Sequence, residues 1–178
     1  GDGSVCARTR RGGGCCFPAL FVPLTYDDEG NLISVVDLQK QTTSYDYDQN
    51  SNLTQVIQDN KAKMTYTYDD YHNVTTATTE EGLEYEFQYD TYGNNIRVST
   101  AVDGVTMEST AAYSSDGNRM VSSTDALGNK TLYGYNEVTN VLDWVQYPED
   151  TAETRTEYTY DSMYRIAMAT EQISNEST

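Results

Sequence analysis

The feature that most constrains this chain is a tandem repeat built around a tyrosine that is followed by a turn sequence. The anchoring tyrosines are 21 residues apart in the first four copies, and 24, 22 and 25 residues apart in three looser copies. They are Tyr26, Tyr47, Tyr68, Tyr89, Tyr113, Tyr135 and Tyr160. Units of this length cannot bury an apolar face alone and are stabilised by stacking on their neighbours. The sequence therefore predicts an array of about seven repeats over residues 25–178.

Each repeat places turn-forming residues directly after its anchoring tyrosine. In Tyr26-Asp27-Asp28-Glu29-Gly30-Asn31, the aspartate can bond a backbone N–H of its own turn, and the glycine can adopt positive φ without a Cβ clash. This spacing predicts a type I turn that closes a hairpin through a G1 bulge. The other residues that define the pattern are Asp48, Asn52, Asp69, Asn73, Asp90, Gly93, Asn94, Gly117, Asn118, Asn140 and Asp161.

The segments on either side of these turns have the composition of β-strands. A second aromatic residue stands two positions before most anchors, as in Tyr66-Thr67-Tyr68, and residues two apart on a strand share a face. After the fourth turn, Ile96, Val98 and Thr100 alternate as in a half-buried strand. A second, less uniform turn follows, such as Val102-Asp103-Gly104-Val105. No stretch shows the helical period, so we predict an all-β chain of tandem hairpins in a continuous, curved or spiralling antiparallel sheet.

Residues 1–24 differ from the rest of the chain. They contain all three cysteines, three arginines and an apolar run that Pro18 and Pro23 interrupt. We interpret this segment as atypical: a sequence artefact, a linker or a processing remnant. The odd number of cysteines does not predict a disulfide framework.

The charge of the chain excludes several classes of partner. There are 28 acidic and 11 basic side chains, for a net charge of −17, and residues 25–178 alone carry −19. This charge repels nucleic-acid phosphates and anionic membrane surfaces. No apolar run reaches the roughly 18 residues that a membrane-spanning helix needs. We therefore expect neither nucleic-acid binding nor membrane insertion.

Candidate catalytic or metal-binding residues are few. His72, the single histidine, stands where other copies carry Gly30, Gly93 or Gly117, which favours a turn residue because histidine tolerates positive φ. The run that begins at Asp46 resembles a calcium loop, but its sixth position is not glycine and its twelfth is Ile57. Weak calcium binding by scattered carboxylates is left open. We predict no catalytic residue, no metal site and no cofactor.

Together, the motifs Tyr-x-Tyr-Asp-x-x-Gly-Asn-Leu and Asp-x-x-Gly-Asn-x-Thr-x-Tyr resemble the YD repeat of the Rhs (rearrangement hotspot) family. The best matches are Thr25 to Leu32, Asp125 to Asn136 and Thr156 to Ile166. The family commonly has asparagine or arginine at the position of Asn31, so Arg165 fits the pattern. Related arrays occur in bacterial wall-associated and polymorphic toxin proteins, toxin-complex subunits and teneurins.

The resemblance implies a structural role. In the family, YD hairpins wind into a hollow shell that encloses a toxin domain, and a conserved terminal core with an Asp-Pro-x-Gly element can cut the chain. That element is not found here, so we expect a non-enzymatic segment of a shell wall. Its partners would be the rest of the shell and an enclosed cargo, in a secreted or cell-surface protein of the bacterial envelope. An adhesive module that binds glycans or a partner protein through exposed tyrosines is the alternative.

Overall fold

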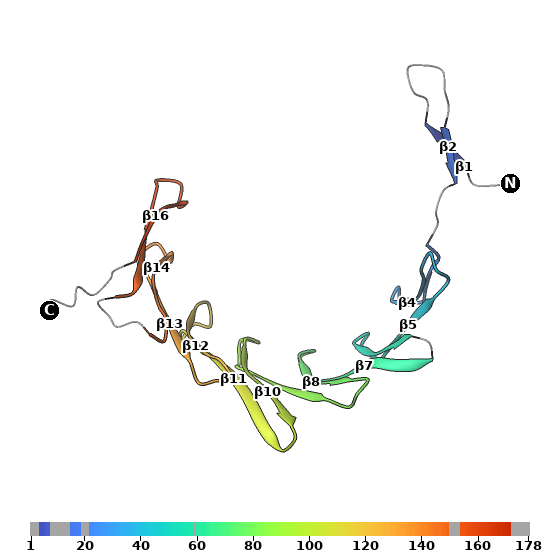
Figure 1. Ribbon diagram of the computed structural model, residues 1–178, viewed down its shortest axis with the longest axis horizontal. Helices are drawn as coiled ribbons and strands as arrows, with labels where there is room; N and C mark the ends of the chain where they lie inside the picture. Colours follow the sequence, from blue (N-terminus) through green and yellow to red (C-terminus); the bar gives the residue numbers. More distant parts are fainter. Residues whose placement is uncertain (1–3, 8–14, 19–21, 59, 150–153, 172–178) are drawn as a thin grey trace. The chain divides into compact units, whose positions relative to one another are not determined.

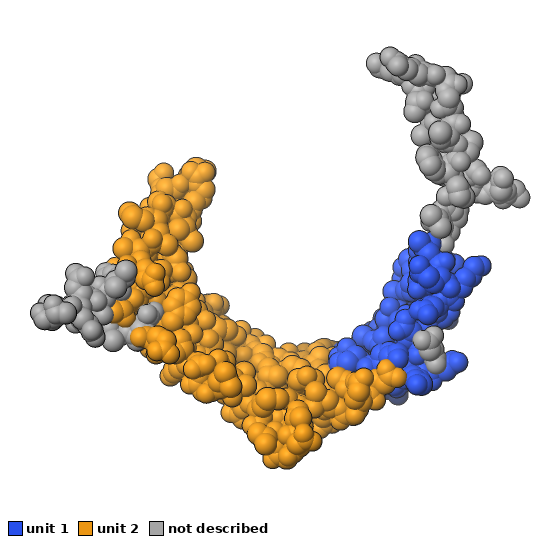
Figure 2. Space-filling view, in the orientation of Figure 1, with its two compact units in different colours: residues 1–66 blue, residues 67–178 orange. Residues whose placement is uncertain are grey.

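The chain is all-β, as predicted. The computed structural model describes residues 4–7, 15–18, 22–58, 60–149 and 154–171, and these form 16 strands and no helix. The chain divides into two units, residues 1–66 and residues 67–178 (Figure 2). Where the structure describes the connection, a strand is joined to the next in sequence by a short turn (Figure 1).

The first unit contains two groups of strands. One is a separate antiparallel pair near the N-terminus, β1 (Ser4–Ala7) and β2 (Cys15–Pro18). The remainder of residues 1–21 lies outside the described residues, so our interpretation of residues 1–24 stays a prediction. The other strands are β3 (Leu24–Tyr26), β4 (Leu32–Val36), β5 (Thr42–Tyr47) and β6 (Leu53–Gln58), and β7 (Lys61–Tyr68) spans the point of division.

The second unit contains the remaining nine strands. The strand order in the sheet follows the sequence from β3 to β16, and every recorded pairing is antiparallel. The curved or spiralling path that we expect for the whole sheet stays a prediction. The strands are β8 (Val74–Thr79), β9 (Glu84–Tyr89), β10 (Asn95–Val102), β11 (Val105–Tyr113), β12 (Met120–Thr124), β13 (Lys130–Tyr135), β14 (Leu142–Gln146), β15 (Thr156–Tyr160) and β16 (Ile166–Glu171).

The strand registers of the second unit give the sheet two chemically different faces. Phe87 pairs with Val98, whereas Glu86 pairs with Ser99 on the opposite face. The face that carries Phe87 and Val98 is called here the aromatic face, and the face that carries Glu86 and Ser99 the polar face. On the polar face, Arg97 forms an ion pair of 2.6 Å with Glu108, a diagonal contact between neighbouring strands.

The sheet is a single layer with little burial. Among the described residues, the buried hydrophobic side chains are Ala77 and Val145, at 6% and 5% exposure. Side chains on the aromatic face are mostly half-buried by their cross-strand neighbours. Stability must therefore come mainly from ladder hydrogen bonds, cross-strand pairs and the turns.

In the pairings recorded for six of the anchoring tyrosines, a β-bulge lies in the strand after the turn. In the fourth repeat, Asn95 pairs with Tyr89 and Arg97 with Gln88, so Ile96 is left as the extra residue. The expected alternation of Ile96, Val98 and Thr100 therefore holds from Val98 onward, because the bulge breaks the period at Ile96. The equivalent extra residues elsewhere are Ile33, Thr54, Val121, Asp143 and Ala167.

Candidate functional site

The turns that follow the anchoring tyrosines, called anchor turns below, have the predicted geometry. In the first, Gly30 has φ of 91°. Its N–H donates to the Asp27 carbonyl at 3.2 Å, and the Asp27 N–H donates to the Asn31 carbonyl at 3.0 Å. These bonds define a type I turn that ends in a G1 bulge.

The aspartate of each regular anchor turn is held by donors within the turn. Oδ1 of Asp69 accepts from the backbone N–H groups of Tyr71 and Asn73, both at 2.9 Å. Its Oδ2 accepts from the side-chain amide of Asn73 at 3.0 Å. The same asparagine-to-aspartate amide bond occurs in the first, second and fourth turns, at Asn31, Asn52 and Asn94. The aspartate and asparagine of the motif thus act as one structural unit.

These bonds lower the pKa values of the turn aspartates. The asparagine amide bond holds the pKa of Asp27 and Asp69 below the usual range, and the Arg165 guanidinium does so for Asp161. The pKa of Asp116 falls to about 2, because Ser114 and Asn118 donate to its carboxylate. All four carboxylates are therefore ionised at neutral pH.

A pH dependence of stability follows. A carboxylate whose pKa is lower in the folded state contributes stability that is present above its unfolded pKa, about 3.9, and is lost as pH falls through the folded value. We expect the urea midpoint of unfolding to fall between about pH 4 and pH 2. Above that range, acidification from pH 7 should raise the midpoint, because it relieves repulsion in a chain of net charge −17. A midpoint that keeps rising to pH 2 would contradict the role of these bonds.

His72 is a turn residue, as predicted. It has φ of 66°, and its N–H donates to the Asp69 carbonyl at 3.2 Å. It therefore occupies the position that Gly93 holds in the next turn, where φ is 84°. The backbone geometry of the turn therefore accounts for the position of His72.

Replacing His72 with glycine is expected to leave stability unchanged or to raise it by up to about 1 kcal/mol. The reason is that glycine adopts positive φ without the Cβ clash that other residues carry. Urea unfolding followed by circular dichroism would measure the change. A clear loss of stability would show that the imidazole makes a contact that matters more than the backbone strain.

Two anchor turns are one residue longer than the sequence pattern indicates. In the fifth, the Ser114 N–H donates to the carbonyl of Arg119, so Arg119 rather than Asn118 closes the turn. Asn118 instead donates to Asp116. In the sixth turn, Asn140 has φ of 59° and occupies the glycine position.

The connections at the other ends of the hairpins reuse the anchor-turn geometry in three places. The turn at Asp37 closes through the Gln41 carbonyl at 2.9 Å, with Lys40 at φ of 69°. The turns at Thr79 and Asp125 have the same bonds, with Gly82 and Gly128 at positive φ. The Asp37 turn contains no glycine. The sequence signal that could have revealed it is an aspartate four residues before Gln41, because the Gln41 N–H donates to Oδ1 of Asp37.

The anchoring tyrosines and turn residues also connect successive repeats. The hydroxyl of Tyr47 donates to the Leu32 carbonyl of the preceding repeat at 2.9 Å, and that of Tyr160 to the Leu142 carbonyl at 2.7 Å. The side-chain amide of Asn94 donates to the Gly117 carbonyl in the following turn at 2.8 Å. These residues therefore contact the neighbouring repeat.

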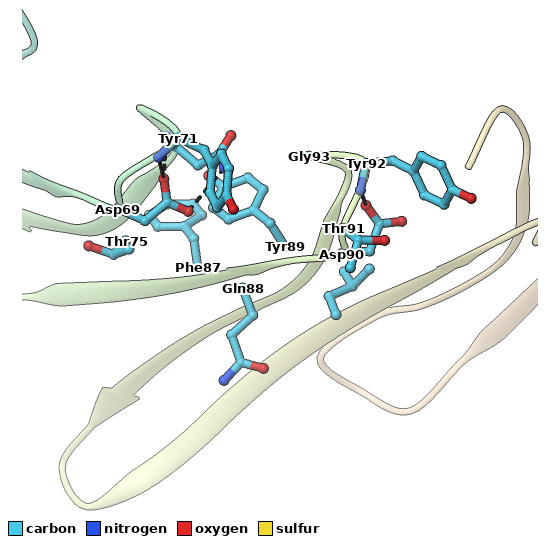
Figure 3. Close-up of a pocket in the computed structure, with 12 residues that line it drawn as sticks. Asp69, Tyr71, Thr75, Phe87, Gln88, Tyr89, Asp90, Thr91, Tyr92 and Gly93 are labelled. Carbon is cyan, nitrogen blue, oxygen red and sulfur yellow. Dashed lines mark hydrogen bonds between the residues drawn. The ribbon is translucent and has the colours of Figure 1, made fainter. Parts of the chain in front are cut away.

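An open groove lies between the third and fourth anchor turns (Figure 3). It has a volume of about 770 Å³. Tyr71, Phe87 and Tyr89 gather at one end, while the ring of Tyr92 points away from them. Tyr71 is 84% exposed. The groove thus combines half-buried strand rings with one open ring from a turn.

In the described part of the chain, no three histidine, cysteine or acidic side chains are grouped as metal ligands would be. The same residues contain no helix long and apolar enough to cross a bilayer. The structure brings the predicted repeat-defining residues together in pairs within turns, and it does not gather them into one site.

Comparison with known proteins identifies the repeat. The model of the family described as RHS Repeat matches residues 26–63, which confirms the resemblance to the Rhs family drawn from the tyrosine-aspartate pattern. A search of curated proteins found no matching sequence.

Solved structures share the fold of nearly the whole chain. The crystal structure of TcdB2-TccC3-TEV is similar with a TM-score of 0.65 and 13% identity, over 91% of this chain and 9% of that chain. Those of TcdB2-TccC3-Cdc42 and TcdB2-TccC3 have TM-scores of 0.59 and 14% identity, over 94% of this chain and 10% of theirs. The chain therefore spans about a tenth of the length of these proteins.

Proposed function

We propose that residues 25–178 are a non-enzymatic segment of an Rhs shell wall that encloses a toxin or another cargo domain in a secreted or cell-surface protein. The observation that carries the proposal is the use of anchoring tyrosines between repeats. Tyr47 and Tyr160 donate to carbonyls of the repeat before them, so they hold the array together. A ring in every repeat is what packing requires, whereas a ligand site needs only a few.

The acidic charge suits a wall around a basic cargo. Residues 25–178 carry a net charge of −19, which favours positively charged partners. The family match at residues 26–63 and the shared fold support the shell role.

Protease protection tests the proposal in the complete protein that contains this segment. We expect the domain carried by the same polypeptide to resist protease in the wild-type protein. A variant that opens the sheet within residues 25–178, such as Gly134→Val, should make that domain sensitive. Equal digestion of the domain in both proteins would overturn the enclosing role.

An adhesive module is the second candidate, and exposed turn tyrosines favour it. Tyr71 and Tyr92 are 84% and 62% exposed, and aromatic rings beside carboxylates can stack on sugars. Binding of neutral oligosaccharides by the 178-residue chain, lost on Tyr71→Ala substitution, would support this alternative.

A further inference from the structure

The groove between the third and fourth anchor turns has a counterpart between the fifth and sixth. In each place, two residues can be matched: the residue that closes the earlier turn, and the anchoring tyrosine of the later turn, which is Tyr89 or Tyr135. Asn73 closes the third turn and Arg119 closes the fifth. The two places can therefore be compared residue by residue.

Between the fifth and sixth anchor turns, the side chain of Arg119 supplies a positive charge. The guanidinium of Arg119 lies over the ring of Tyr135, 5.6 Å from its centroid. Its Nη1 also donates to Oδ1 of Asn140 in the sixth turn at 3.2 Å. A guanidinium thus bridges the two turns through a cation–π contact and a hydrogen bond.

Between the third and fourth anchor turns, the equivalent residue is Asn73, whose side chain is too short to bridge the two turns. The amide of Asn73 donates to Asp69 within its own turn at 3.0 Å. Tyr89 lines the groove together with Tyr71 and Phe87, and the three rings gather at one end of it (Figure 3). The groove is therefore lined by aromatic rings, and the preceding turn supplies no guanidinium to them.

The charge around this groove favours a cation. The residues that line it include two aspartates and no lysine or arginine. Asp69 and Asp90 line the groove. Negative charge beside π faces attracts ammonium and guanidinium groups.

We propose that this groove binds an arginine side chain of a basic, extended peptide segment, seated over Tyr89 as Arg119 is seated over Tyr135. The groove volume of about 770 Å³ leaves room for several residues of such a segment. The inference does not depend on the shell role, because the groove and its charge belong to the repeat itself.

A neutral sugar fits the groove less well than a cation. Asp90 already accepts from the N–H groups of Tyr92 and Asn94 and from the Asn94 amide, which leaves only one of its roughly four acceptor positions for a sugar hydroxyl. These bonds leave the negative charge in place, and a cation responds to that charge without displacing them.

Fluorescence anisotropy on the 178-residue chain tests the proposal. The probe is a fluorescein-labelled heptapeptide of alternating glycine and arginine, and a glutamate peptide of equal length is its control. We expect the arginine peptide to bind and the affinity to fall as NaCl rises from about 50 to 500 mM. Absence of binding, or equal binding of the glutamate peptide, would overturn the proposal.

Asn73→Arg is the decisive variant, because its guanidinium should pair with the Asp69 carboxylate, as Arg165 pairs with Asp161, and remove negative charge from the groove wall. Arginine is accommodated at this position of the seventh turn, where Arg165 bonds Asp161. We expect at least about a tenfold loss of peptide affinity. Glu84→Gln, which changes the charge equally on the polar face, should alter affinity by less than about twofold. Equal effects of the two variants would show attraction by overall charge and no site.

A second pair of variants tests the aromatic contribution without adding charge. Tyr71→Ala should weaken binding by about two- to fivefold, as expected for loss of an exposed cation–π contact, and Tyr71→Phe should retain it. Met163→Ala changes the same turn position in the seventh repeat and should have no effect. Displacement of the peptide by cellohexaose, or loss of binding in Tyr71→Phe, would point to a sugar site instead.

Discussion

Replacing Gly134 with alanine is expected to lower the free energy of unfolding by about 1–3 kcal/mol, as overpacking does at other well-packed sites. Gly134 lies in β13 directly opposite Trp144 in β14. A Cβ at Gly134 would lie 2.0 Å from Cε2 of Trp144 and 2.1 Å from its Nε1. The indole ring must move, and its contact with Arg155, whose guanidinium lies 4.5 Å from the ring centroid, would be disturbed.

Urea unfolding followed by circular dichroism would measure this loss, and the Trp144→Leu background provides its control. In that background the ring is absent, so the further change Gly134→Ala should cost less than about 0.5 kcal/mol. Gly134 is not among the residues with positive φ, so backbone strain adds nothing to either measurement. An equal cost in both backgrounds would show that the ring does not determine the requirement for glycine.

Local chemistry made the anchor turns and strand class predictable from the sequence. The aspartate, the glycine and the asparagine of the first turn act on backbone groups within five residues, as the bonds of Asp27 show. His72 could be placed for the same reason, since its sister positions carry glycine. The placement of both rings of a Tyr-x-Tyr pair on one face of a strand could be predicted from the two-residue period alone.

Features that depend on pairing between strands were not predictable in this way. The bulge at Ile96 arises from the register of β9 with β10. The packing of Trp144 on Gly134 joins residues ten apart in sequence through facing strands. Neither the bulge nor the close approach leaves a local signal, because each requires knowledge of which residues face each other.

The fifth and sixth anchor turns show a different limit of prediction from the sequence pattern. One additional residue in the fifth turn moves the closing role from Asn118 to Arg119, and the guanidinium then reaches Tyr135. A pattern aligned on Gly117 and Asn118 cannot detect this shift. The contact that led to the proposed arginine site was therefore visible only in the structure.

Replacing Gly117 with alanine is expected to destabilise the chain more than replacing Gly128. Both glycines have positive φ, 73° and 86°, so alanine should cost about 1–2 kcal/mol in backbone strain at each. Nothing lies within 4 Å of a Cβ at Gly128, whereas a Cβ at Gly117 would lie 2.4 Å from Cγ of Tyr92. The displaced ring would add an overpacking cost of about 1 kcal/mol or more.

The difference between these two variants isolates the contact between the fourth and fifth anchor turns. Moving Tyr92 also strains its hydroxyl bond to the Ser115 carbonyl, now 3.0 Å, and the Asn94 bond to the Gly117 carbonyl. Urea unfolding of both variants, repeated in a Tyr92→Ala background, should show the excess cost at Gly117 only when the ring is present. Equal losses of unfolding free energy for Gly117→Ala and Gly128→Ala would mean that the ring contact between the fourth and fifth turns does not contribute to stability. A larger loss at Gly117 would mean that the ring contact between neighbouring turns contributes to the stability of the array.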